Sequence, residues 1–285
     1  MYANFKHSGH LGDIVYALPA MRAQAHNYGL RVRLYIPSDA ASVLALPEGV
    51  THIGGDRMIT EVMFAFLAPL LRTQPYIESV HFVPASEIPD DTNNYDIVRN
   101  SGLSLGAGNL KDHYFKLFGL ISDPPCRWLE PSDRAISTGT GYDIVLGRST
   151  RHLNSAIDYG VLAPLGLRVG FVGLAEEFLA LRDRFPALSM DHVPTRHALD
   201  ACDEIAEASL YIGNQSFFFS IAEGLQANRL LEVYEPAPNV IPSGGRSGQF
   251  LTTLGLARLV SKFFSLNVDV PDLEAAKRCD FQLSL

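Results

Sequence analysis

Short runs of apolar and β-branched residues alternate along the chain with longer segments in which apolar residues recur at helical spacing. This alternation predicts strands and helices in turn, which is typical of α/β proteins with parallel sheets. The expected strands are residues 3–7, 31–36, 80–83, 96–98, 143–147, 167–172, 191–193, 210–214 and 230–234. The expected helices are residues 14–28, 60–71, 110–120, 176–185, 198–209, 216–227 and 251–264.

Proline and glycine gather between residues 122 and 141, where the periodicity is lost. Such a segment is typical of an interdomain linker, and the strand–helix alternation starts again after it. We therefore expect an N-terminal domain over residues 1–135, a C-terminal domain over residues 136–265, and a tail over residues 266–285 that packs back on the first domain. Parallel sheets bind ligands outside the carboxyl ends of their strands, so two such domains facing each other would form a cleft.

Composition narrows the class of protein. The 285 residues are 47% hydrophobic and 19% charged, which excludes disordered and collagen-like chains. A net charge of −8 argues against a general nucleic-acid coat and against an anionic membrane surface as partner. No apolar run approaches the ~20 residues of a membrane span, and the N-terminal residues lack the features of a signal peptide. Three widely spaced cysteines, Cys126, Cys202 and Cys279, suggest neither a disulfide framework nor a metal site, so a cytoplasmic setting is expected.

A polar turn with glycines follows the first expected strand, at Ser8, Gly9, His10, Gly12 and Asp13. Glycines allow the backbone to approach a ligand closely, and a helix start favours negative charge. The Asp13 carboxylate could act as a general base that takes a proton from an acceptor hydroxyl. It could equally cap the helix, and the local pattern alone favours capping.

Two hydroxyls flanked by two arginines follow the first strand of the second half, at Arg148, Ser149, Thr150 and Arg151. Guanidinium groups bind phosphate bidentately, so this loop is a candidate anion clamp. The alternative is a solvated loop with ordinary surface arginines.

A strand-to-helix junction at Gly213, Asn214, Gln215 and Ser216 is the third candidate. Free N–H groups at a helix start, with hydroxyl and amide side chains nearby, can hold a diphosphate without a cation. Asn214 or Ser216 could instead cap the helix.

A proline-rich loop that contains Glu235 follows the last expected strand. Its place beside the expected cleft makes it a candidate site for a nucleoside. The alternative is an ordinary connection.

Four segments in this order resemble the heptosyltransferase-like glycosyltransferases, the family of the ADP-heptose:lipopolysaccharide enzymes (similar to glycosyltransferase family 9). The similarity covers roughly residues 3–242. The four segments are Gly12–Ala20, Arg148–Arg151, Val172–Glu177 and Ile212–Leu225.

The resemblance implies the GT-B arrangement, in which two Rossmann-like domains face each other and the C-terminal one holds a nucleotide-sugar. It also implies inverting sugar transfer without a metal or other cofactor, with Asp13 as the base. This shifts our interpretation of Asp13 from capping to catalysis. Ser149, Thr150 and the amides of Gln215 and Ser216 would then hold the diphosphate and stabilise the leaving group.

The chain departs from the family pattern in the fourth segment, where the family has Asp, Gly and His and this chain has Gln215, Phe217 and Ser220. The sugar donor therefore stays open. So does the acceptor, which could be a saccharide, a small molecule or a hydroxylated nucleobase in DNA, although the acidic balance opposes duplex DNA. Two alternatives to a transferase remain: a nucleotide-sugar binding protein without activity, and a GT-B-like epimerase or hydrolase.

Overall fold

The described residues form two separate sheets, and every strand pairing within them is parallel. The computed structural model describes residues 1–42, 54–121, 126–133 and 141–266. The first sheet has the order β3-β2-β1-β4 and the second the order β10-β9-β8-β5-β6-β7. The strands are β1 (Tyr2–Lys6), β2 (Arg31–Pro37), β3 (Ile77–Val83), β4 (Asn93–Asn94), β5 (Ile144–Gly147), β6 (Val169–Phe171), β7 (Asp191–His192), β8 (Leu210–Asn214), β9 (Arg229–Glu232) and β10 (Ser247–Phe250).

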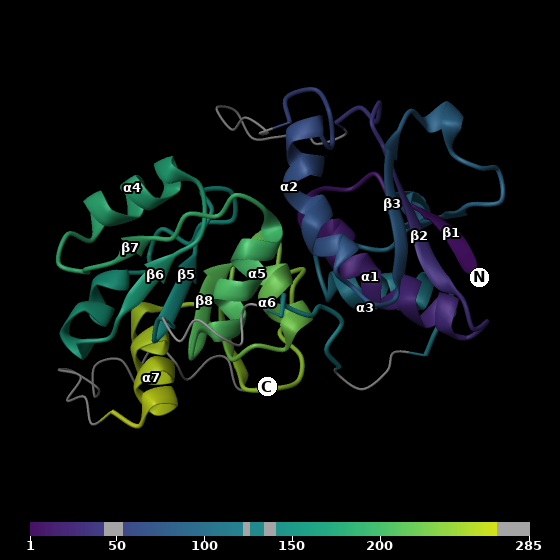
Figure 1. The fold of residues 1–285 in the computed structure, drawn as a ribbon. Helices are drawn as coiled ribbons and strands as arrows, with labels where there is room; N and C mark the ends of the chain where they lie inside the picture. Colours follow the sequence, from purple (N-terminus) through teal and green to yellow (C-terminus); the bar gives the residue numbers. More distant parts are fainter. Residues whose placement is uncertain (43–53, 122–125, 134–140, 267–285) are drawn as a thin grey trace.

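Helices α1, α2, α5 and α6 lie between the two sheets (Figure 1), where α1 contacts α6 and α2 contacts α5. Their apolar side chains, together with those of the first sheet, form a core that continues across both halves. A second core lies against the other face of the second sheet. The helices are α1 (Leu11–His26), α2 (Glu61–Arg72), α3 (Leu110–Leu117), α4 (Ala175–Arg184), α5 (Ala198–Glu207), α6 (Phe217–Leu225) and α7 (Thr253–Phe264).

The α/β class with parallel sheets is confirmed, with local differences from the sequence prediction. Residues 96–98 belong to the 3₁₀ helix η2 (Tyr95–Asn100) rather than to a strand. The short strand β4 and the edge strand β10 were not expected. Along the described segments, no helix has the length and apolar character that crossing a membrane requires.

Pro19 lies in the middle of α1, not in its first turn as expected. Proline has no N–H, so the carbonyl of Val15, four residues earlier, lacks its usual helical partner. The indole Nε1 of Trp128 donates to that carbonyl at 3.1 Å. A residue far along the chain therefore compensates for the proline.

The described part of the expected linker, residues 126–133, packs between the halves instead of crossing solvent. The backbone N–H groups of Trp128 and Leu129 both donate to the carbonyl of Gly224 in α6, at 2.9 and 3.0 Å. Tyr76 of the first half donates its hydroxyl to the carbonyl of Trp128 at 2.9 Å. The expected boundary at residues 135/136 and the tail beyond residue 266 lie outside the described residues, so the division into domains stays a prediction.

Candidate functional site

Both sheets have a point where the strand order reverses, between β1 and β4 in the first and between β5 and β8 in the second. At such a point the connections leave in opposite directions, and the carboxyl ends of the strands there are the usual ligand site of an open parallel sheet. The polar turn before α1 follows β1, and the two predicted donor segments follow β5 and β8. The predicted site residues therefore lie where this topology favours binding.

The turn after β1 is held by His7, which is buried. The N–H of Gly9 donates to His7 Nδ1 at 2.9 Å, so the proton of the neutral ring lies on Nε2, which donates to the hydroxyl of Tyr114 at 2.7 Å. Burial lowers the pKa of His7 to about 4. A Cβ on Gly9 would clash with the His7 ring and lie 2.8 Å from Asp13 Cβ, so only glycine fits there.

Ser8 connects this turn to η2. Its N–H donates to Asp96 Oδ1 at 2.7 Å, and Arg99 donates to its hydroxyl at 3.0 Å. Asp96 also pairs with Lys6 at 3.7 Å. His10 is buried at the N-cap position of α1. The predicted acceptor-side residues thus form one polar network at the start of α1.

Asp13 is half-buried in the first turn of α1. Its Oδ2 accepts from the backbone N–H of His10 at 3.1 Å. Asp13 is therefore not the N-cap residue that the sequence suggested, but the third residue of the helix, and it caps by reaching back to the N-cap residue His10. Within the described residues no hydrogen bond is recorded for Oδ1. Capping therefore uses one carboxylate oxygen, and both interpretations of Asp13 are compatible with the geometry.

Arg148 has a different environment from that of an anion clamp. Its guanidinium is buried and donates to both carboxylate oxygens of Glu232, at 2.7 and 3.1 Å. Glu232 also accepts from Tyr159 at 2.7 Å and from the N–H of Asn154 at 2.7 Å. The guanidinium is committed to holding the loop after β5, so we leave Arg148 out of the proposed donor site.

Asn214 and Gln215 are also occupied by the protein itself. The buried Asn214 accepts from the N–H of Ser149 at 3.0 Å and donates to the carbonyls of Ser149 and His152, at 2.7 and 2.9 Å. Gln215 donates to the carbonyl of Ala237 at 2.7 Å and accepts from the N–H of Tyr234 at 2.8 Å. These side chains connect the loops after β5, β8 and β9, so their role is to position those loops.

The remaining predicted donor residues lie around these connections. Gly213 is buried opposite Gly147 in the sheet register. Ser149 is half-buried, while Thr150, Arg151 and Glu235 are exposed. The N–H of Thr150 donates to Glu177 at 3.3 Å. Ser216 is the N-cap residue of α6, so it stands beside the free N–H groups of the first helical turn.

The two sets of loops meet at the starts of α1 and α6. A Cβ on Gly12 would lie 3.7 Å from the Cα of Phe217, the first residue of α6. Asp13 is close enough to His152, in the loop after β5, to raise the pKa of that ring, although burial lowers it more. The predicted base and the predicted donor loops are thus neighbours.

His152 was not among the predicted site residues. Its Nδ1 donates to the backbone carbonyl of Gln215 at 2.9 Å, and its ring packs against Tyr234 with 5.2 Å between centroids. The only signal in the sequence was its position directly after Arg151 in the candidate anion loop.

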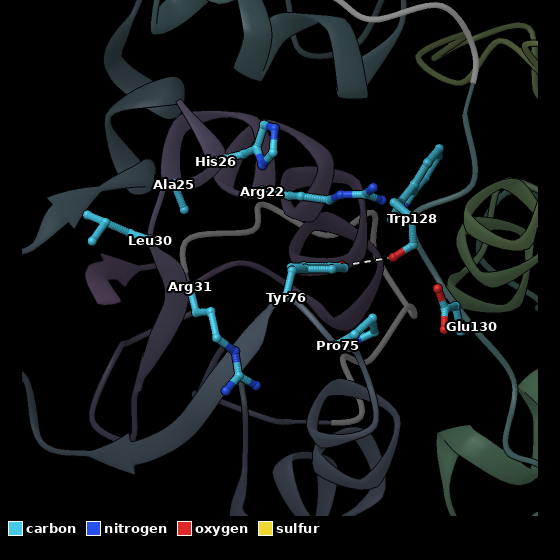
Figure 2. Close-up of a pocket in the computed structure, with 9 residues that line it drawn as sticks. All are labelled: Arg22, Ala25, His26, Leu30, Arg31, Pro75, Tyr76, Trp128 and Glu130. Carbon is cyan, nitrogen blue, oxygen red and sulfur yellow. Dashed lines mark hydrogen bonds between the residues drawn. The ribbon is translucent and has the colours of Figure 1, made fainter. Parts of the chain in front are cut away.

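A cavity of about 340 Å³ lies at the other end of α1 (Figure 2). Arg22 and His26 of α1, Tyr76 and Trp128 contribute to its walls, and Tyr76 contacts the carbonyl of Trp128 there. None of the residues that line this cavity is a predicted site residue, and the proposed function does not use the cavity. Across the described residues, no group of three His, Cys, Asp or Glu side chains is arranged to hold a metal ion.

No protein-family model and no curated protein matches the chain. Several solved structures have the same fold. The E. coli ADP-heptose lipopolysaccharide heptosyltransferase II aligns with 93% of this chain and 99% of its own, at 14% identity and a TM-score of 0.61. The E. coli heptosyltransferase WaaC with ADP aligns with 92% of this chain and 100% of its own, at 12% identity and a TM-score of 0.59. A family 9 glycosyl transferase from Veillonella parvula aligns with 94% of this chain and 90% of its own, at 11% identity and a TM-score of 0.55. The expected resemblance to heptosyltransferases is therefore found in the fold, over 92–94% of this chain.

Proposed function

We propose that this chain is a glycosyltransferase that moves a sugar from a nucleotide-sugar to an acceptor hydroxyl, with inversion and without a metal. The observation that carries the proposal is that Asp13, at the start of α1, lies beside the loops that follow β5 and β8. Those loops belong to the reversal point of the second sheet, where a nucleotide is expected. The similarity in fold to heptosyltransferases supports the same conclusion.

In this proposal the two halves form the GT-B arrangement, and the second half holds the donor. The ligand contacts come from the hydroxyls of Ser149 and Thr150 and from the first-turn N–H groups of α6, since a helix start favours an anion. These groups stabilise the charge that develops on the diphosphate as it leaves.

Asp13 acts as the general base. Its Oδ2 accepts from the N–H of His10, which fixes the carboxylate, while Oδ1 takes the proton of the acceptor hydroxyl. The acceptor oxygen then forms a bond to the anomeric carbon as the bond from that carbon to the phosphate oxygen breaks. Because attack comes from the face opposite the leaving diphosphate, the anomeric configuration inverts.

The test is release of nucleoside diphosphate from a panel of nucleotide-sugars, with and without candidate acceptors. Asp13→Asn should lower the rate about 10²–10⁴-fold and leave nucleotide binding unchanged. Asp112→Asn is the matched control, because Asp112 also lies in the first turn of a helix, α3, and should keep full activity.

Each alternative predicts a different result. Release that needs no acceptor would identify a hydrolase, and binding without release would identify a nucleotide-sugar binding protein. Full turnover by Asp13→Asn would contradict the assignment of the base, and no binding of any nucleotide-sugar would contradict the donor site itself.

A further inference from the structure

His152 lies where the loops of the second half meet the start of α1. Its Nδ1 is 2.9 Å from the backbone carbonyl oxygen of Gln215, and since that oxygen can only accept, Nδ1 carries a hydrogen. Asn214 donates to the backbone carbonyl of His152 at 2.9 Å. Ring and backbone are therefore both held, and the orientation of the ring is set by the loops after β5 and β8.

The second ring nitrogen, Nε2, has no recorded hydrogen-bond partner within the described segments of the chain. Because Nδ1 is committed as a donor, Nε2 accepts in the neutral ring and donates once the ring is protonated. The imidazole packs against Tyr234, with centroids 5.2 Å apart. The ring thus carries a basic atom that changes from acceptor to donor with its charge.

The charged groups that act on this ring are Asp13 on α1 and Arg151 in its own loop, and the titratable group packed on it is Tyr234. Burial is the largest influence and lowers the pKa of His152; Arg151 lowers it too, while the Gln215 carbonyl and Asp13 raise it. The free protein therefore has a neutral ring at neutral pH. A diphosphate beside Nε2 would favour the protonated form, since an adjacent negative charge raises the pKa of an imidazole.

The other cations of this loop are less suited to an enclosed phosphate. Arg148 is buried against Glu232 and Arg151 is exposed. His152 is half-buried, so a bond from it to phosphate is less screened by water.

We propose that His152 binds the terminal phosphate of a nucleoside diphosphate through Nε2 and takes up a proton from solvent as the nucleotide binds. This rests on the proposed donor site and adds the group that balances the leaving charge. During transfer the acceptor proton goes to Asp13, and the electron pair of the broken carbon–oxygen bond stays on the terminal phosphate. The imidazolium keeps its proton and hydrogen-bonds that oxygen.

The experiment is titration calorimetry with ADP, UDP and GDP, one at a time, in buffers of different ionisation enthalpy. Uptake of up to one proton per nucleotide is expected near neutral pH, with tighter binding as the pH falls. Adenosine, which has no phosphate, should cause no uptake.

Two substitutions separate charge from structure. His152→Asn keeps an amide N–H that can replace Nδ1 as donor to Gln215, so it should fold normally. This variant should show no proton uptake. At pH 6 its affinity for the preferred nucleotide should be lower by about tenfold or more, the size expected for loss of a charge-assisted hydrogen bond. His152→Gln places a neutral donor near Nε2 and should lose the uptake with a smaller loss of affinity. His26→Gln, at an exposed site in α1, should behave as the parent protein.

The failures are distinguishable. Nucleotide binding without proton uptake, or equal uptake by His152→Asn and the parent, would overturn the role of His152 and leave the donor site standing. If none of the three nucleotides binds, both the role of His152 and the proposed function are overturned.

Discussion

The two halves supply their site residues in different ways. In the first half a single turn, residues 7–13, carries the half-buried Asp13 on a network around the buried His7. In the second half three loops meet, and most of their polar side chains bind one another. Examples are the side chains of Arg148, Asn214 and Gln215, which hydrogen-bond other groups of the protein.

The difference shows that polar residues in a candidate site need not touch the ligand. In the second half they fix the loop backbone, so the groups left for a ligand are hydroxyls, helix N–H groups and one imidazole. In the first half the catalytic candidate itself remains half-buried at a helix start. The following substitutions test whether this contrast holds.

The largest effect on stability is expected at the buried ion pair of the second half. Arg148→Met leaves the Glu232 carboxylate charged and buried, and should lower the free energy of unfolding by about 3–5 kcal/mol. The measurement is urea denaturation. Arg182→Met, which removes an exposed pair with Asp183, should cost only about 0–1 kcal/mol. If Arg148→Met keeps its stability and loses nucleotide binding, Arg148 is a ligand residue and the contrast is wrong.

The first half should respond to pH through His7. The folded state keeps this ring neutral down to about pH 4, whereas the unfolded chain protonates it below its ordinary pKa of 6.5. The contribution of His7 to the free energy of unfolding should therefore be complete above pH 6.5. As the pH drops toward 4, about 3 kcal/mol of this contribution should be lost. Comparing unfolding free energies at pH 7 and 4.5 checks this.

His7→Gln should remove most of that pH dependence, whatever its own effect on stability. His26→Gln, at the exposed end of α1, should leave the dependence as it is. An unchanged slope in His7→Gln would mean that other groups cause the acid sensitivity.

A smaller effect is expected at the connection between the loops after β5 and β8. Asn214→Ala removes three hydrogen bonds to Ser149 and His152 and should cost about 1–3 kcal/mol. Nucleotide affinity should fall as well, because these bonds position the loop. Asn228→Ala, at an exposed bond to Ser209, should change stability by less than about 0.5 kcal/mol. Normal affinity in Asn214→Ala would show that the loop does not need this support.

The pattern of apolar residues was sufficient to predict most helices and strands, because buried parallel strands and amphipathic helices have distinct periods. It missed β10, whose Ser247, Gly248 and Gln249 have little strand preference. That strand forms because its backbone pairs with β9 at the edge of the sheet.

For the site, the local sequence was sufficient to locate the loops. It did not show which side chains are already hydrogen-bonded to other parts of the protein. Arg148 satisfied the pattern of an anion clamp, yet its partner Glu232 lies 84 positions later in the chain. His152 was overlooked for the same reason, since Gln215 and Tyr234, which orient it, are distant in sequence. Partners brought together only by the fold decide which polar group is available.

The bond between the Trp128 indole and the Val15 carbonyl, which Pro19 deprives of its helical partner, joins neutral groups inside the core. Neither group titrates in the physiological range, and counter-ions do not screen a contact of this kind. Acid that protonates His7 or salt that weakens surface charge pairs should therefore leave this contact in place. This connection between the halves is thus insensitive to changes of pH and salt concentration that disturb the turn before α1.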